Sequence, residues 1–215
     1  MNLISRLACH SQLQNINHMF PFPNKVVVGI TGGIACGKST VCKKFADLGW
    51  QVVSTDSLVH QLLEDDQEVI GQIVNRWGAP MKDVHGNIDK VQLAHVIFNS
   101  STERTWLEGL LHPLVREGWM SLVQLSSYRK FVVEVPLLFE NDLDALFTKT
   151  ISVHTSSCKQ ITRLQERGLD HDEIIARINA QMPVEEKSDR AHFVILGGGD
   201  LNFLELQIKN FLTHL

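Results

Sequence analysis

The sequence predicts an α/β protein built on a parallel sheet of five strands, with flanking helices and a helical insertion. Three observations lead to this fold class. Short apolar, β-branched runs alternate with helical stretches, which is typical of parallel strands that are buried on both faces. The first run leads into a glycine-rich turn and then a helix. About 70 residues of helical pattern separate the second run from the third, far more than an ordinary crossover needs.

The first expected strand, 26–30, and the first expected helix, 38–48, enclose a glycine-rich motif of the form G-x-x-x-x-G-K-[ST]. Its glycines let backbone N–H groups turn toward phosphate oxygens, and the positive end of the helix points at the same anion. The motif therefore predicts a bound nucleoside triphosphate. In such motifs the lysine, here Lys38, reaches the β- and γ-phosphates, and the hydroxyl of Ser39 is a ligand of Mg²⁺. The expected ATP-binding residues are Gly33, Ile34, Ala35, Cys36, Gly37, Lys38, Ser39 and Thr40.

Residues 51–54 form the second expected strand, and Asp56 follows its carboxyl end. Ligands of open α/β sheets bind at that end of the strands. Two interpretations of Asp56 fit this position equally well. It is either the cap of the next helix or a general base that faces the phosphates.

The insertion, residues 57–127, carries helical periodicity in four pieces, at 58–63, 69–77, 93–98 and 107–122. We expect Pro113 to end or kink the last helix, because proline lacks the N–H that the helix needs. The neighbouring His112 is as well explained by packing as by contact with a ligand. Insertions of this kind in phosphate-loop proteins commonly bind the second substrate.

The remaining strands are expected at 131–135, 150–153 and 193–196, and a last helix at 201–212 packs one apolar face on the core. Glu134 stands where a Walker-B acid would hold a metal ion through water. The chain has neither the D-x-x-G nor the N-K-x-D sequence of GTPases.

A polar helical stretch at about 157–190 separates the fourth strand from the fifth. Lys159, Arg163 and Arg167 recur every fourth residue and are expected on one helix face. Such a face is either a solvated surface with acidic neighbours or a lid whose arginines neutralise a transferring phosphoryl group. We favour the lid.

The composition is that of an ordinary globular protein, with 44% hydrophobic and 20% charged residues. A net charge of −4 argues against nucleic acid as a partner. The four cysteines form neither a C-x-x-C pair nor a zinc spacing, and the sequence holds no apolar run of membrane-spanning length, so we expect a cytoplasmic protein. Residues 1–24 are expected to be a dispensable tail, with Met19 as an alternative start.

Taken together, these residues resemble the dephospho-CoA kinase family over about 26–195. The phosphate loop alone is common to many NTPases. More specific are three later blocks in this order: Leu-His-Pro-Leu-Val at 111–115, Val-Pro-Leu-Leu-Phe-Glu at 135–140, and Arg-Ile-x-x-Gln at 177–181. The resemblance implies a P-loop kinase-like parallel five-stranded sheet with flanking helices, a helical insertion and a helical lid.

The resemblance also implies the reaction, in which ATP phosphorylates the ribose 3′-hydroxyl of dephospho-CoA with Mg²⁺, in the last step of coenzyme A synthesis. It makes Asp56 the base and Lys38, Arg163 and Arg167 the other catalytic residues. The core would comprise 25–56 and 128–215, and the insertion would accept the CoA moiety. Acceptor contacts are expected at His112, Pro136 and Leu137.

Two stretches of the sequence depart from the family pattern. The family has D-A-D after the second strand, where this chain has Ser54-Thr55-Asp56, so the base position is kept and the first acid is lost. Near the fifth strand the family has A-D-x-V-I-x-N, where this chain has His192 and Gly197 at the two polar positions. The asparagine that Gly197 replaces helps to hold adenine in the family. We therefore expect weaker discrimination between purine bases.

Two other functions remain as alternatives, a kinase of nucleoside monophosphates and a slowly hydrolysing nucleotide-gated switch. The His-Pro-Leu-Val sequence of the insertion argues against the first. The missing GTPase sequences argue against the second. The oligomeric state does not follow from the sequence.

Overall fold

The computed structural model describes residues 21–215, which form two compact units. One unit is Thr55–Leu122, and the other combines residues 21–54 with Val123–Leu215. The predicted tail lies almost wholly outside the described residues, so its dispensability stays a prediction.

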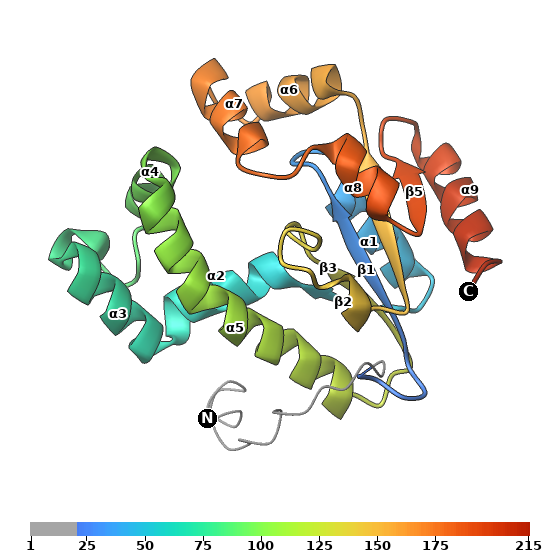
Figure 1. Cartoon of the computed structure of the whole chain (residues 1–215), viewed down its shortest axis with the longest axis horizontal. Coiled ribbons are helices and arrows are strands. Elements are labelled where there is room, and N and C mark those ends of the chain that lie inside the picture. Colours follow the sequence, from blue (N-terminus) through green and yellow to red (C-terminus); the bar gives the residue numbers. More distant parts are fainter. Residues whose placement is uncertain (1–20) are drawn as a thin grey trace. The chain divides into compact units, whose positions relative to one another are not determined.

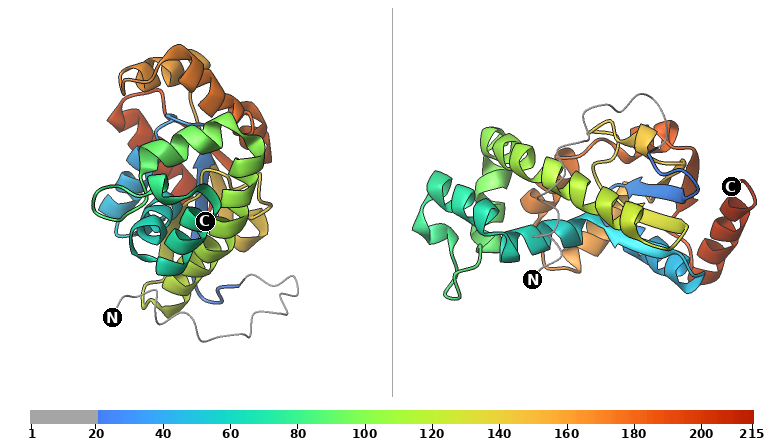
Figure 2. Two further views of the ribbon diagram at one scale, coloured as in Figure 1. Left: turned by 90° about the vertical axis from the view of Figure 1, so that its left-hand side faces the viewer. Right: turned by 90° about the horizontal axis from the view of Figure 1, so that it is seen from below.

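The larger unit is built on a five-stranded sheet in the order β2-β3-β1-β4-β5, and every neighbouring pair is parallel (Figure 1). This arrangement confirms the predicted fold class. The strands are β1 (Val26–Gly32), β2 (Gln51–Ser54), β3 (Lys130–Glu134), β4 (Lys149–His154) and β5 (Phe193–Leu196). The bounds of β2 and β5 are those predicted, and the other strands differ by one or two residues at an end. The right-hand view of Figure 2 shows strands of the sheet side by side.

The centre of the sheet positions the phosphate loop. Strand β1 lies between β3 and β4, with β2 and β3 on one side of it and β4 and β5 on the other. Parallel sheets bind their ligands at such a point, beyond the carboxyl ends of the strands. The register pairs Ile30 with Glu134 and Gly32 with Val153. Glu134 therefore lies beside the end of β1, where the phosphate loop begins.

Helices cover both faces of this sheet. In Figure 1, α8 crosses in front of β1 and β4, and α1 lies behind the sheet. The ring of Phe45, in α1, meets the rings of Trp50 and Phe211 edge to face, with centroids 5.3 and 6.0 Å away. These aromatic contacts join α1 and α9 in one apolar core. The helices of this unit are α1 (Lys38–Asp47), α6 (Ser157–Gln165), α7 (His171–Asn179), α8 (Val184–Arg190) and α9 (Leu201–Leu212).

The smaller unit is helical, and each of the four predicted stretches lies within one of its helices. Helix α5 also runs a few residues beyond this unit. The helices are α2 (Thr55–Asp65), α3 (Gln67–Trp77), α4 (Lys90–Asn99) and α5 (Ser101–Leu125).

An ion pair with aromatic neighbours joins α3 to α5. The guanidinium of Arg76 donates to both oxygens of Glu103, at 2.6 and 3.0 Å, and the indole N–H of Trp77 donates to the same carboxylate at 2.7 Å. Trp77 and Trp106 meet edge to face, with ring centroids 5.0 Å apart. Hydrogen bonds from Arg76 and Trp77 lower the pKa of Glu103.

Pro113 was expected to end or kink the last helix. It does not end it, because α5 continues through it to Leu125. Proline removes one helix hydrogen bond, and its ring crowds the carbonyl group four residues earlier. Here that carbonyl belongs to Gly109, which has no Cβ and is exposed. Water can satisfy the exposed carbonyl, so the helix tolerates the proline.

Candidate functional site

The glycine-rich turn forms a tight loop between β1 and α1. Gly32 has φ +139°, and a Cβ at this position would lie 2.3 Å from the carbonyl oxygen of Val153. Only glycine therefore allows β1 to run this close to β4. Ala35 also adopts a left-handed conformation, with φ 58°. The backbone of the loop curls as the motif predicts.

Helix α1 begins directly at the end of this loop. Its N-cap, Gly37, supplies no side-chain hydrogen bond to the first turn. Free N–H groups and the helix dipole make such an end favourable for phosphate. The ammonium group of Lys38 is buried and donates to the carbonyl oxygens of Gly32 and Gly33, at 3.2 and 3.0 Å. Lys38 thus holds the loop in shape as well as bringing charge to it.

Two oxygen ligands suited to Mg²⁺ lie next to the loop. The hydroxyl of Ser39 donates to the carboxylate of Glu134 at 3.3 Å, and Glu134 is buried at the end of β3. Hydroxyl and carboxylate oxygens are the protein ligands that Mg²⁺ prefers. Burial, followed by the charge of Glu134, raises the pKa of the neighbouring Cys42 thiol, so this thiol stays neutral.

Helix α6 holds the other side of the loop. The side chain of Gln160 donates to the carbonyl of Ile34 at 2.8 Å. Arg163 donates through Nη1 to the carbonyl of Ala35 at 2.8 Å and through Nη2 to that of Gly197 at 2.9 Å. Arg163 therefore links the phosphate loop to the segment that follows β5.

These contacts border a pocket of about 320 Å³. It combines the phosphate loop, the start of α1, the two arginines Arg163 and Arg167, and the start of α9. Its lining residues are Ala35, Gly37, Thr40, Val41, Arg163, Arg167, Leu196, Gly197, Gly199, Asp200, Leu201 and Leu204.

Arg167 does not lie on α6 as predicted, because the helix ends at Gln165 and a turn follows. Gly168 ends this segment with a left-handed φ of +84°, a conformation that breaks a helix. Arg167 is exposed and still lines the same pocket as Arg163. The turn, rather than the helical repeat, brings the two arginines together.

The segment after β5 is held from three sides. The amide of Gln207 pairs with both backbone groups of Leu196, and Lys159 donates to the carbonyl of Gly198. A Cβ on Gly197 would lie 2.0 Å from the carbonyl oxygen of Cys36, in the phosphate loop. Glycine at 197 is therefore required by this close approach.

The predicted acceptor residues fall in both units. Pro136 and Leu137, both half-buried, follow β3, and the hydroxyl of Thr31 donates to the carbonyl of Pro136 at 3.0 Å. Asp56 belongs to the helical unit and is exposed in the first turn of α2. His112 is half-buried in α5 of that unit.

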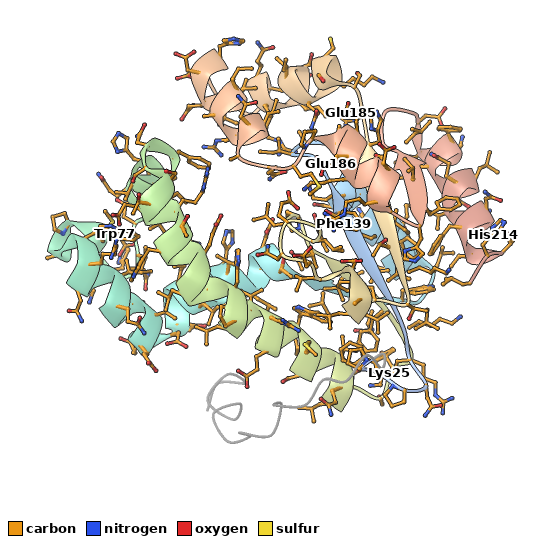
Figure 3. The ribbon with its side chains drawn as sticks, in the orientation of Figure 1. Lys25, Trp77, Phe139, Glu185, Glu186 and His214 are labelled. Atoms are coloured by element: carbon orange, nitrogen blue, oxygen red, sulfur yellow. The ribbon has the colours of Figure 1, made fainter. Side chains whose placement is uncertain are left out.

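One polar cluster, around Lys187 in α8, was not predicted from the sequence. Lys187 is completely buried in α8 and forms an ion pair of 2.8 Å with Glu140. Lys187 lies in a stretch of charged residues typical of a solvated helix, so no local pattern could have identified it. The side-chain view in Figure 3 includes this region, with Phe139 labelled close to α8.

Residues 21–215 contain no group of three or more histidine, cysteine or acidic side chains able to hold a metal ion. No helix within this range is both long enough and apolar enough to cross a bilayer.

Comparison with known proteins connects this chain to one family. Residues 26–202 match the family model described as dephospho-CoA kinase. A dephospho-CoA kinase of Shewanella oneidensis is 34% identical over 186 residues, which cover 86% of this chain and 91% of the relative. One of Gloeobacter violaceus is 36% identical over 189 residues, or 87% of this chain and 92% of the relative.

Solved structures give the same result. The structure of TT1252 from Thermus thermophilus superposes with a TM-score of 0.76 at 32% identity, covering 89% of this chain and 98% of that one. The dephospho-CoA kinase from Campylobacter jejuni superposes with a TM-score of 0.64 at 26% identity, covering 87% of this chain and 96% of that one.

Proposed function

We propose that this chain, which belongs to the dephospho-CoA kinase family, transfers the γ-phosphoryl group of ATP to the ribose 3′-hydroxyl of dephospho-CoA. The products are coenzyme A and ADP, and the step completes coenzyme A synthesis in the cytoplasm. The observation that carries the proposal is the phosphate loop at the end of β1, held closed by Arg163. Phosphoryl transfer depends on positioning and charge stabilisation, which such a loop supplies.

The triphosphate lies along the loop, against the N–H groups at the start of α1. Lys38 moves its hydrogen bonds from the carbonyls of Gly32 and Gly33 to the β- and γ-phosphates. Ser39 and Glu134 would hold Mg²⁺, a role that their contact at 3.3 Å supports. When bound, Mg²⁺ neutralises charge on the phosphate oxygens.

The nucleoside occupies the pocket beside the loop. Its walls combine apolar side chains of α1 and α9 with the two arginines. The guanidinium of Arg163 is engaged by two backbone carbonyls, so we assign it to shaping this pocket. Arg167, exposed in the turn after α6, supplies charge to the transferring group.

We assign acceptor contacts to His112 of the helical insertion and to Pro136 and Leu137 after β3. Asp56 accepts the proton of the 3′-hydroxyl as the bond to phosphorus forms. The residue follows β2 by two positions, and Ser54 at the end of that strand pairs with Glu134. This place in the chain supports a base at the carboxyl edge of the sheet.

A coupled assay of ADP release tests the proposal. The protein is incubated with ATP and Mg²⁺ together with dephospho-CoA, with nucleoside monophosphates, or with no acceptor. We expect release that depends on dephospho-CoA. If a nucleoside monophosphate gave as much ADP release as dephospho-CoA or more, the assignment of dephospho-CoA as the acceptor would be wrong. If ADP release without any acceptor equalled that with dephospho-CoA, the protein would be an NTPase.

A further inference from the structure

The buried ammonium group of Lys187 lies beneath the segment that follows β3. It donates to the carbonyl oxygen of Pro136 at 2.6 Å and pairs with the carboxylate of Glu140 at 2.8 Å. Its side chain has no exposed surface. A lysine is rarely buried to this extent unless its charge is paired with an opposite charge. Lys187 therefore holds both ends of the segment 136–140, which we name the acceptor loop.

Glu140 extends the connection to the chain just before α8. The oxygen that pairs with Lys187 also accepts the backbone N–H of Met182 at 2.9 Å. The second carboxylate oxygen of Glu140 is buried, and no described residue donates to it. Within the described residues, the carboxylate of Glu140 therefore accepts hydrogen bonds through one oxygen only, from the N–H of Met182 and the ammonium group of Lys187.

The carbonyl of Pro136 joins the acceptor loop to β1 as well. It accepts the hydroxyl of Thr31, at 3.0 Å, in addition to Lys187. Thr31 precedes the phosphate loop directly. The acceptor loop also meets α8 through Arg190, whose guanidinium lies 4.8 Å from the ring centroid of Phe139. Figure 3 shows Phe139 close to this helix.

We infer that Lys187 is a positioning residue. By holding the Pro136 carbonyl and the Glu140 carboxylate, it keeps the acceptor loop in the position that binding of the second substrate requires. The inference rests on the proposed function, because it assumes that the loop contacts dephospho-CoA. Lys187 itself touches no reacting atom in this scheme.

Single and double replacements of Lys187 and Glu140 can distinguish an effect on stability from an effect on the position of the acceptor loop. Removing one partner of a buried ion pair leaves an uncompensated charge, which destabilises the fold strongly. Replacing both partners together leaves no buried charge without a partner, so it should cost less stability than removing one partner. The hydrogen bond from Lys187 to Pro136, however, is lost whenever Lys187 itself is replaced, alone or together with Glu140. A purely structural role predicts that function returns with stability, and a positioning role predicts that it does not.

The experiment compares Lys187→Met, Glu140→Gln and the double variant, with Glu186→Gln on the exposed side of α8 as the matched control. Glutamine at 140 can still accept the N–H of Met182. We expect Lys187→Met to lower Tm and to raise the KM for dephospho-CoA about tenfold, because a charged hydrogen bond to the loop is lost. The KM for ATP should change less than twofold.

In the double variant we expect Tm to recover while the KM for dephospho-CoA stays raised. Recovery of both together would overturn the inference, because the pair would then act on stability alone. An equal rise in the two KM values would also overturn it.

Hydrogen exchange at residues 137–141 gives a second measurement that needs no turnover. We expect faster exchange at these residues in Lys187→Met and in the double variant. In Glu186→Gln the exchange rate should match that of the wild type. Unchanged exchange would contradict the inference. If the wild-type chain released no ADP with dephospho-CoA, the proposed function would fail, while this exchange would still test the contact between Lys187 and the loop.

Discussion

The guanidinium of Arg163 donates a hydrogen bond of 2.9 Å to the carbonyl oxygen of Gly197, and its other nitrogen donates to the carbonyl of Ala35. One side chain thereby joins the phosphate loop to the segment after β5. A lysine has a single ammonium group and cannot reproduce this planar, two-pronged contact. The geometry leads to a prediction about nucleotide binding.

Arg163→Lys should raise the KM for ATP about tenfold and change kcat less than threefold, because a charged hydrogen bond that shapes the nucleotide pocket is lost. Steady-state kinetics with ATP varied at saturating dephospho-CoA measure both values. Arg167→Lys is the matched control in the same pocket, and we expect it to act mainly on kcat. A fall in kcat without a change in KM for Arg163→Lys would assign this arginine to the transition state instead.

Lys38→Met should reduce kcat by about 10²–10³, the usual effect of removing a charge that stabilises the transition state. Methionine keeps the apolar stem of the buried side chain and loses only the ammonium group. Because Lys38 also donates to Gly32 and Gly33, we expect a lower Tm as well. Lys43→Met, exposed on the same helix, should leave both quantities unchanged. Retention of more than a tenth of wild-type turnover would be incompatible with the assigned role.

ATP and GTP should be used with kcat/KM values within about tenfold of each other, because a missing side-chain contact to the base weakens discrimination. Gly197 offers no side chain, and the carbonyls of Gly197 and Gly198 already accept from Arg163 and Lys159. Turnover with each nucleotide at equal concentration measures the ratio. A strong preference for ATP would show that backbone groups of residues 197–199 recognise adenine.

Gly197→Asn tests the same segment in the opposite direction. The family residue should not restore discrimination, because its Cβ would collide with the carbonyl of Cys36, 2.0 Å away. We expect weaker binding of both nucleotides in titrations of the variant. A variant that gained ATP preference at unchanged affinity would show that the phosphate loop moves aside.

The sheet and the phosphate loop were predictable because their determinants are local. The β-branched runs at 51–54 and 193–196 define β2 and β5 at the observed bounds, and the glycine motif defines the turn before α1. Even the four helical pieces of the insertion followed from periodicity alone. Each of these features depends on residues that are neighbours in the sequence.

Features that depend on distant contacts were not predictable. The local sequence predicts that Lys187 lies on the surface. Its partners Pro136 and Glu140 are about 50 residues earlier in the chain, so no local pattern reveals them. The helical repeat placed Arg167 on α6, although a turn ends the helix first. The continuation of α5 through Pro113 depends on solvent access at Gly109, which a residue pattern does not report. Asp56 remains assigned by position and resemblance.

The contribution of Glu103 to stability should depend on pH. Its pKa is lowered in the folded state by Arg76 and Trp77, so the stabilisation is present above the unfolded pKa and is lost as the pH falls through the lower folded value. We expect Glu103→Gln to lower Tm by about 1–3 °C at neutral pH, and the gap from wild type to close in acid. Tryptophan fluorescence during thermal unfolding measures both. A gap that stays constant with pH would show that the charge of Glu103 is not responsible.

Asp56→Asn should leave the binding of ATP and dephospho-CoA nearly unchanged and reduce kcat at least a hundredfold. Asparagine keeps the size and the hydrogen-bonding reach of the side chain and removes its basicity. Transfer of the hydroxyl proton to a positioned base contributes about 10²–10⁴ to the rate, so losing the base alone accounts for the expected fall. Single-turnover kinetics and equilibrium titrations separate the two effects. Asp65→Asn, an exposed aspartate in the same helix, is the control for a change of charge on α2. If kcat held while the affinity for ATP collapsed, Asp56 would act on the metal ion or the fold, and the proton acceptor would be a different residue.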